Sequence, residues 1–87
     1  MRIALVDDTA EELKILSDII NNELPHATVF TFSSGESFLE AWDDNSYDLI
    51  LLDIYMSGLL GVDVAKRIRE TDPDVRLVFC TTSNEFA

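Results

Sequence analysis

Four short apolar runs, separated by stretches with helical periodicity, constrain the fold of this sequence more than any other feature. The runs are typical of β-strands and lie at Arg2–Val6, Ala27–Phe32, Leu49–Leu52 and Val75–Thr81. The segments between them are too long for hairpins, so they must be crossovers that carry helices. Strands connected in this way form a parallel sheet with right-handed crossovers. The chain is therefore predicted to have an α/β fold: an open, doubly wound parallel sheet in a three-layer α/β/α arrangement.

The first helical segment has clear start and stop signals. Thr9 followed by Glu12 has the spacing of a capping box, and Pro25 cannot continue a helix. Between them an apolar stripe at helical spacing is formed by Leu13, Leu16, Ile20 and Leu24. This stripe predicts a helix that packs against the sheet.

Two more helices are expected between the later strands. One begins at Ser33, which has Glu36 three residues after it, and its apolar residues are Phe38, Leu39 and Trp42. The other runs from about Gly61 to Thr71, and its apolar residues are Val64, Ala65 and Ile68. It is expected to end before Asp72, because proline at the next position disfavours helical backbone there.

Composition narrows the class of protein. A chain of 87 residues supports one domain. Its 17 acidic and 6 basic residues give a formal net charge of −11, which disfavours nucleic acid and anionic lipid and favours cations or basic partners. The apolar runs are far shorter than a membrane span, and the single cysteine, Cys80, fits a reducing compartment. A cytoplasmic protein is expected.

Acidic and hydroxyl side chains stand where three of the predicted strands end. Asp7 and Asp8 follow the first strand, Asp53 follows the third, and Thr81 closes the fourth. Because α/β proteins bind ligands at the carboxyl ends of their strands, these groups are expected to converge in one crevice. Three acids there would repel one another unless a cation relieves them, and Mg²⁺ prefers carboxylate and phosphate oxygens. The pattern predicts an acidic Mg²⁺ pocket.

The order of these residues resembles a known family. The Asp-Asp pair, the segment Asp-Ile-Tyr-Met beginning at Asp53, the glycine at Gly61 and the threonine after the fourth strand are similar to the receiver domain of two-component response regulators. The resemblance covers the whole chain and implies a CheY-like, flavodoxin-like fold. The tail 81–87 is similar to receivers that precede a LytTR-type DNA-binding domain.

The resemblance also implies a role for each residue of the acidic pocket. Asp53 would accept a phosphoryl group from a sensor histidine kinase. Asp8 and Asp53 would bind Mg²⁺ directly, and Asp7 would bind it through water. The backbone carbonyl of Tyr55 would be a further ligand. The hydroxyl of Thr81 would bond to the aspartyl phosphate and couple the fourth strand to phosphorylation.

Two departures from the family pattern lead to further expectations. Ser57 stands where the family often has proline, a loop change that is expected to be tolerated. The family's fifth strand, with its characteristic lysine, and its last helix are not found before Ala87. Residues 1–87 are therefore expected to be the N-terminal, incomplete part of a receiver domain. The fourth strand would then be an exposed edge through which the chain self-associates.

The function predicted from these residues is a signalling switch rather than an enzyme, controlling a DNA-binding output. Ile15 and Ile19, which lie off the apolar stripe of the first helix, would form a docking patch for the kinase.

Two alternative functions stay open. One is an Mg²⁺-dependent phosphatase of the haloacid dehalogenase type, although such enzymes typically have Asp-x-Asp where this chain has Asp53 and then Tyr55. The other is a degenerate receiver used only for protein contacts.

Overall fold

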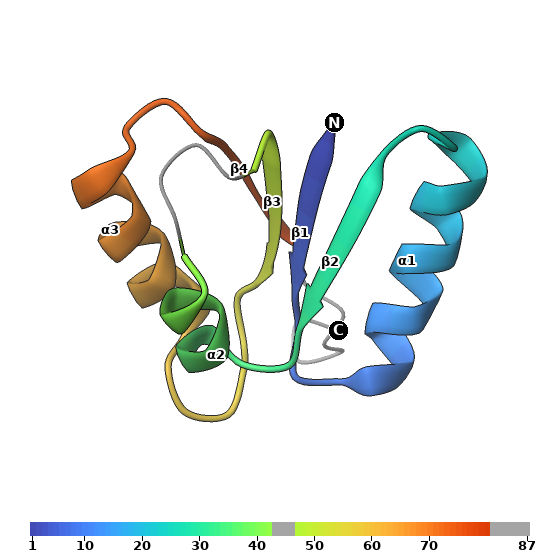
Figure 1. Ribbon diagram of the computed structural model, residues 1–87. Helices are drawn as coiled ribbons and strands as arrows, with labels where there is room; N and C mark the ends of the chain where they lie inside the picture. Colours follow the sequence, from blue (N-terminus) through green and yellow to red (C-terminus); the bar gives the residue numbers. More distant parts are fainter. Residues whose placement is uncertain (43–46, 81–87) are drawn as a thin grey trace.

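The computed structural model describes residues 1–42 and 47–80, and within them four strands form one parallel sheet (Figure 1). The strands are β1 (Arg2–Val6), β2 (Thr28–Phe32), β3 (Leu49–Asp53) and β4 (Arg76–Cys80), in the spatial order β2-β1-β3-β4. The connecting helices are α1 (Ala10–Glu23), α2 (Gly35–Glu40) and α3 (Gly61–Thr71). This arrangement confirms the predicted doubly wound parallel sheet.

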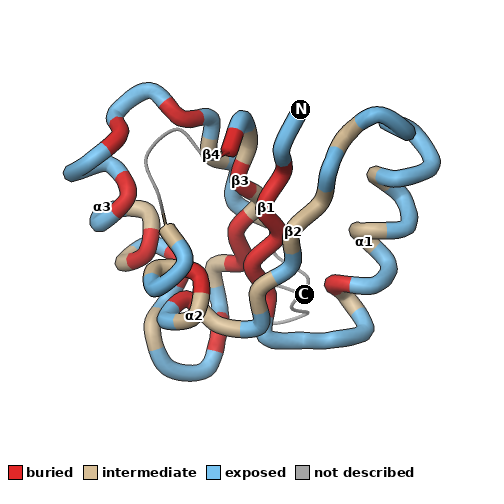
Figure 2. Tube along the Cα trace, in the orientation of Figure 1, coloured by how far each residue is buried: buried red, intermediate tan, exposed pale blue. Residues whose placement is uncertain are grey.

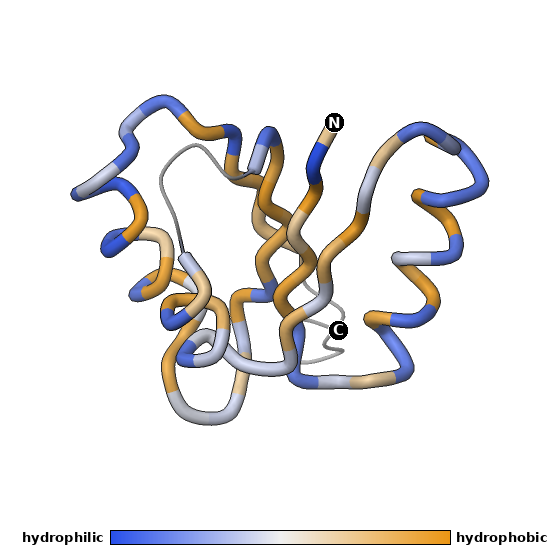
Figure 3. Tube along the Cα trace, viewed as in Figure 1, coloured by the Kyte–Doolittle hydropathy of each residue, from blue (hydrophilic) through white to orange (hydrophobic). Residues whose placement is uncertain are grey.

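The sheet is covered on both faces, by α1 on one and by α2 and α3 on the other (Figure 1). Successive residues of a strand point to opposite faces. Ile3 and Leu5 of β1 therefore pack with Leu13 of α1, whereas Ala4 and Val6 pack in the core shared with α2 and α3. Figure 2 shows the buried residues gathered on the inner strands β1 and β3, and Figure 3 shows that the same strands are hydrophobic. Burial on both faces explains their nearly continuous apolar sequence.

The core on the α2–α3 face is the larger of the two. Its buried side chains include Phe38, Ile50, Leu52, Val64 and Ile68. Trp42, the single tryptophan of the chain, packs against this core with its ring centroid 5.8 Å from that of Phe38. The Nε1–H of Trp42 donates to the hydroxyl of Thr71 at 3.0 Å. This hydrogen bond ties the segment after α2 to the last residue of α3.

The helix starts differ from the predicted capping. Thr9 is the N-cap residue of α1, but its side chain makes no capping hydrogen bond, so the predicted capping box with Glu12 is wrong. α2 is capped by Ser34 rather than by Ser33, and the Ser34 hydroxyl accepts a hydrogen bond from the Ser37 N–H at 3.0 Å. Sequence spacing thus located both helix starts to within a residue or two but not the groups that cap them.

Two apolar residues lie beyond the helices that were predicted to carry them. Leu24 is the C-cap residue of α1 and is exposed, because the helix ends at Glu23, ahead of Pro25. Trp42 lies beyond α2, which ends at Glu40, although it still packs against the core. Helical spacing therefore identified the apolar faces of α1 and α2 correctly, but it predicted helices that extend past their observed ends.

β4 lies at one side of the described sheet, and β2 lies at the other. β4 pairs only with β3 among the described strands, and its residues Val78 and Phe79 are exposed. Self-association through this edge stays a prediction. Within the same part of the chain, no helix combines the length and apolar character needed to cross a membrane.

The start of α3 lies close against the end of β3. The Gly61 N–H donates to the carbonyl of Ile54 at 3.0 Å, which brings the first residue of the helix onto the last peptide groups of the strand. A Cβ atom on Gly61 would overlap the carbonyl oxygen of Asp53 and would lie 3.0 Å from the Cα of Ile54. Close approach of two backbone segments therefore requires glycine at this position.

Replacing Gly61 with alanine should destabilise the protein by about 1–3 kcal/mol, because the added methyl group forces two hydrogen-bonded backbone segments apart. Helix propensity alone predicts the opposite sign, since alanine stabilises a helix by about 1 kcal/mol relative to glycine. Urea unfolding followed by the fluorescence of Trp42 measures the change. Val62→Ala, at the exposed next residue, is the control and should shift the free energy of unfolding by about 0.5 kcal/mol or less. A Gly61→Ala protein as stable as the wild type would show that the contact relaxes.

Candidate functional site

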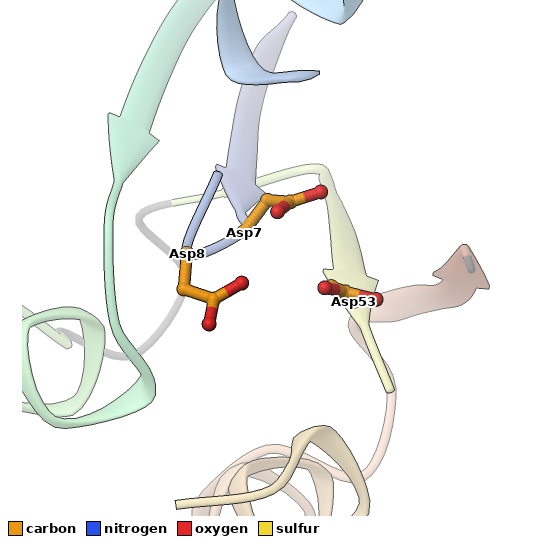
Figure 4. A group of neighbouring side chains, drawn as sticks. All are labelled: Asp7, Asp8 and Asp53. Carbon is orange, nitrogen blue, oxygen red and sulfur yellow. The ribbon is translucent and has the colours of Figure 1, made fainter. Parts of the chain in front are cut away.

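Three aspartates meet at the carboxyl end of the sheet (Figure 4). Asp7 and Asp8 directly follow β1, and Asp53 is the last residue of β3. In the parallel pairing of these two strands Val6 lies opposite Leu52, so the residues that come next, Asp7 and Asp53, are neighbours. One carboxylate oxygen from each of the three aspartates lies within 4.8 Å of the corresponding oxygens of the other two. We refer to Asp7, Asp8 and Asp53 as the aspartate cluster.

Two carboxylates of the aspartate cluster are buried: Asp7 is 3% exposed and Asp53 is 5% exposed. The Oδ1 atom of Asp7 accepts a hydrogen bond from the Thr9 N–H at 2.9 Å. The Oδ1 atom of Asp53, by contrast, is buried without a hydrogen-bond partner in the described part of the chain. Burial, and then the neighbouring charge of Asp7, raise the pKa of Asp53 above its ordinary value. Backbone hydrogen bonds from Tyr55 and Ile54 oppose this rise in the pKa in part. It is therefore the Oδ1 atom of Asp53, and not the whole carboxylate, that lacks a partner among the described residues.

Asp8 is exposed, and the loop after β3 holds its carboxylate. The backbone N–H of Ser57 donates to Oδ2 of Asp8 at 2.9 Å, and the Ser57 hydroxyl donates to the same oxygen at 2.8 Å. Both bonds favour the ionised carboxylate, so they hold the pKa of Asp8 below its ordinary value. Asp8 and Asp53 are thus neighbouring aspartates whose environments shift their proton affinity in opposite directions.

The aspartate cluster fits a hard divalent cation. Mg²⁺ binds oxygen ligands at about 2.0–2.1 Å and usually keeps several waters beside one or two carboxylates. A spread of up to 4.8 Å between the oxygens suits a set in which one carboxylate binds through water. A cation at this position would give Oδ1 of Asp53 the partner it lacks and would offset the repulsion among three negative charges.

The other residues predicted for the site lie in three separate places. Tyr55, whose backbone carbonyl is the expected ligand, lies two residues after Asp53 in the loop before α3. Thr81 lies outside the described residues. Ile15 and Ile19 lie one turn apart on α1 and are 45% and 53% exposed. The structure therefore keeps both isoleucines out of the core.

Ser57 is the residue of the site whose part the sequence did not reveal. The sequence indicates only a tolerated loop change there, yet both donors of this serine bond to Asp8. The contact joins residues 49 positions apart, which no local pattern reports. The sequence offers one signal for this contact: serine stands where the family often has proline. Serine gains an N–H and a hydroxyl donor that proline does not have.

Comparison with known proteins gives a consistent result. The family described as the response regulator receiver domain matches residues 3–87. The positive alginate biosynthesis regulatory protein of Pseudomonas aeruginosa is 35% identical over an alignment of 89 positions, which covers 100% of this chain and 36% of that protein. This chain thus spans little more than a third of the length of that relative.

Solved structures show the same similarity. A structure of the response regulator protein TrrA from Thermotoga maritima, in complex with Mg²⁺–BeF, is 30% identical with a TM-score of 0.86, over 98% of this chain and 72% of that one. A structure of the histidine kinase ThkA in complex with TrrA is 31% identical with a TM-score of 0.83, over 99% of this chain and 73% of that one.

The order of the strands, the aspartates at their ends and the match over nearly the whole chain agree with one another. The family suggested by the sequence is therefore the family that the comparisons identify. The chain belongs to the response regulator receiver domain family.

Proposed function

We propose that this chain is a phosphoacceptor of two-component signalling and that Asp53 receives a phosphoryl group from a sensor histidine kinase. The observation that carries the proposal is the buried, unpartnered Oδ1 of Asp53 beside two other carboxylates. Such an oxygen is available as a nucleophile, and a cation would offset the charge of its carboxylate. The similar TrrA structures, one with Mg²⁺–BeF and one with the kinase ThkA, support both the cation and the kinase.

The transfer itself would use the residues of the aspartate cluster. An Asp53 carboxylate oxygen would attack phosphorus, the P–N bond of a phosphohistidine would break with its electron pair going to the imidazole, and an acyl phosphate would remain on Asp53. Asp8, Asp53 and the Tyr55 carbonyl would hold Mg²⁺, with Asp7 acting through water. When bound, Mg²⁺ supplies charge neutralisation for the phosphoryl oxygens. The hydroxyl of Thr81 would bond to the new phosphoryl group and transmit its presence to β4.

The partners follow from the same proposal. Ile15 and Ile19 would form a docking patch for a helix of the kinase, because exposed apolar side chains one turn apart suit burial against a partner. The receiver, here residues 1–87, would control a DNA-binding output of the LytTR type, and so transcription in the cytoplasm. The tail 81–87 and the regulatory name of the Pseudomonas aeruginosa relative support this output.

The two alternative functions have less support. A phosphatase of the haloacid dehalogenase type needs a second acid two residues after the nucleophile, where this chain has Tyr55. Asp7, Asp8 and Asp53 form the one group of metal-binding type found in the described residues, and none of them stands in that position. A degenerate receiver would have no need to bury a carboxylate oxygen without a partner. The aspartate cluster therefore favours the phosphoacceptor.

Incubation with acetyl phosphate and Mg²⁺ should place one phosphate on Asp53, and Asp53→Asn should reduce labelling to background, because an amide is not a nucleophile here. Mass spectrometry of the intact protein and of its peptides measures the labelling and its position. Asp48→Asn changes an exposed aspartate next to the opposite end of β3 and should be labelled like the wild type. Labelling of Asp53→Asn at the wild-type level would contradict the proposal.

Asp53→Asn should also raise the stability of the metal-free protein at neutral pH by roughly 1 kcal/mol, because it removes a buried charge next to Asp7. The raised pKa of Asp53 gives the pH dependence. The folded state binds the proton more tightly than the unfolded state, so protonated Asp53 contributes stability to the wild type below its ordinary pKa. That contribution is lost as pH rises through the folded pKa, and the advantage of Asp53→Asn appears over the same range.

Thermal unfolding followed by circular dichroism tests both statements. The Tm difference between Asp53→Asn and wild type should shrink as the pH falls toward the pKa of Asp53. Added Mg²⁺ should raise the Tm of the wild type and leave that of Asp53→Asn nearly unchanged. Equal Tm values for the two metal-free proteins at pH 7 would mean that the buried charge costs nothing.

Ile15→Lys should slow phosphoryl transfer from the cognate kinase by roughly tenfold, because it places a charge in an apolar contact. Labelling by acetyl phosphate, which needs no docking, should stay at the wild-type rate. Leu24→Lys, which changes an exposed apolar residue just past the end of the same helix, is the matched control and should leave both rates unchanged. If Ile15→Lys reduced both reactions equally, the substitution would have damaged the fold rather than a docking patch.

A further inference from the structure

The loop between β3 and α3 holds the exposed Asp8 carboxylate through Ser57, and we propose that Ser57 is a positioning residue for Mg²⁺ binding at the aspartate cluster. The inference rests on the proposed function, because it assumes that the aspartate cluster binds Mg²⁺. It assigns a role to a residue at which the family often has proline, which has neither of the two donors.

Ser57 makes two hydrogen bonds to a single oxygen of Asp8. The N–H and the hydroxyl of Ser57 donate to Oδ2 of Asp8 at 2.9 and 2.8 Å. Two donors on a single oxygen fix both the rotamer of Asp8 and the plane of its carboxylate, and they leave Oδ1 free of Ser57. Figure 4 shows the carboxylate of Asp8 on the side that faces Asp53. Ser57 therefore orients Asp8 through one carboxylate oxygen and leaves the other oxygen clear of its own donors.

Ser57 stands on an anchored part of the loop. The side chain of Met56, directly before it, is buried in the core on the α2–α3 face. The loop is also fixed where it leaves β3, because the Ile54 N–H donates to the Cys80 carbonyl at 3.3 Å and the Ile54 carbonyl accepts from the Gly61 N–H at 3.0 Å. The donors of Ser57 thus have a defined position, which they transmit to Asp8 on a different loop.

The same loop carries the backbone carbonyl of Tyr55, the proposed ligand two residues before Ser57. Holding Asp8 to this loop therefore sets the two ligands relative to each other before the ion arrives. An exposed carboxylate without such bonds would lose its side-chain freedom only on binding, and that entropy would reduce the affinity. Hydrogen bonds to a metal-binding carboxylate typically change metal affinity by about 10–100-fold.

The two donors also draw charge away from the carboxylate, which acts in the opposite direction. Both bonds fall on Oδ2, however, so Ser57 does not compete with the ion for Oδ1. Orientation of an otherwise mobile, exposed side chain is then the larger effect. Loss of the Ser57 donors is accordingly expected to weaken Mg²⁺ binding rather than to strengthen it.

Isothermal titration of the protein with MgCl₂ measures the effect directly. Ser57→Ala keeps the N–H and loses the hydroxyl, so the Kd for Mg²⁺ should rise by about 3- to 10-fold. Ser57→Pro loses both donors and should raise the Kd by about 10- to 100-fold. Ser57→Thr keeps both donors and should restore wild-type affinity. Ser33→Ala, at an exposed serine outside the aspartate cluster, should bind like the wild type.

The possible results separate this inference from the proposed function. A wild-type protein that does not bind Mg²⁺ would overturn both. If the wild type binds, and Ser57→Ala binds equally well or more tightly, only the role of Ser57 is wrong. A metal-free Tm of Ser57→Ala equal to that of the wild type, together with weaker Mg²⁺ binding and rescue by Ser57→Thr, is the result expected for a positioning residue.

Discussion

The parallel pairing of β1 with β3 places two buried carboxylates next to each other, and the aspartate cluster depends on this pairing. Asp7 and Asp53 follow strand residues that face each other in the register, so neither can move away without breaking the ladder. The strands themselves are held by fully buried side chains such as Ile3, Leu5 and Ile50. Each of these contributes about 1.5–3 kcal/mol. The hydrophobic core thus supplies the energy that keeps like charges together.

Within the aspartate cluster, Asp53 and Asp8 lie in opposite chemical environments. Asp53 is buried, and one of its oxygens has no partner. Asp8 is exposed, and two donors from Ser57 stabilise its charge. Neighbouring acids in opposite environments can take different roles, one as the group that reacts and the other as a fixed charge that holds a cation. A receiver domain needs both roles within a few ångströms.

Much of this molecule could be predicted from its sequence. The strands and the order of elements follow from apolar runs and helical spacing, and the meeting of Asp7 with Asp53 follows from the rule for parallel strand ends. The exceptions are contacts that several groups could equally make. The Thr9 side chain makes no capping hydrogen bond, and at the start of α2 the neighbouring Ser34 takes the donor that Ser33 was predicted to bind. The bond between Ser57 and Asp8 depends on how two distant loops meet, which no periodicity encodes.

The hydrogen bond between Trp42 and Thr71 has a consequence for any optical study of this protein. It places the single tryptophan on the α2–α3 side of the sheet, while α1 packs the buried Leu13 and the partly buried Leu16 and Ile20 against the other side. An indole signal will therefore report the melting of one layer and remain silent about the other. Helices with little buried surface open at lower free energy than the core does. Detachment of α1 would then be seen by amide hydrogen exchange and would leave the emission spectrum unchanged.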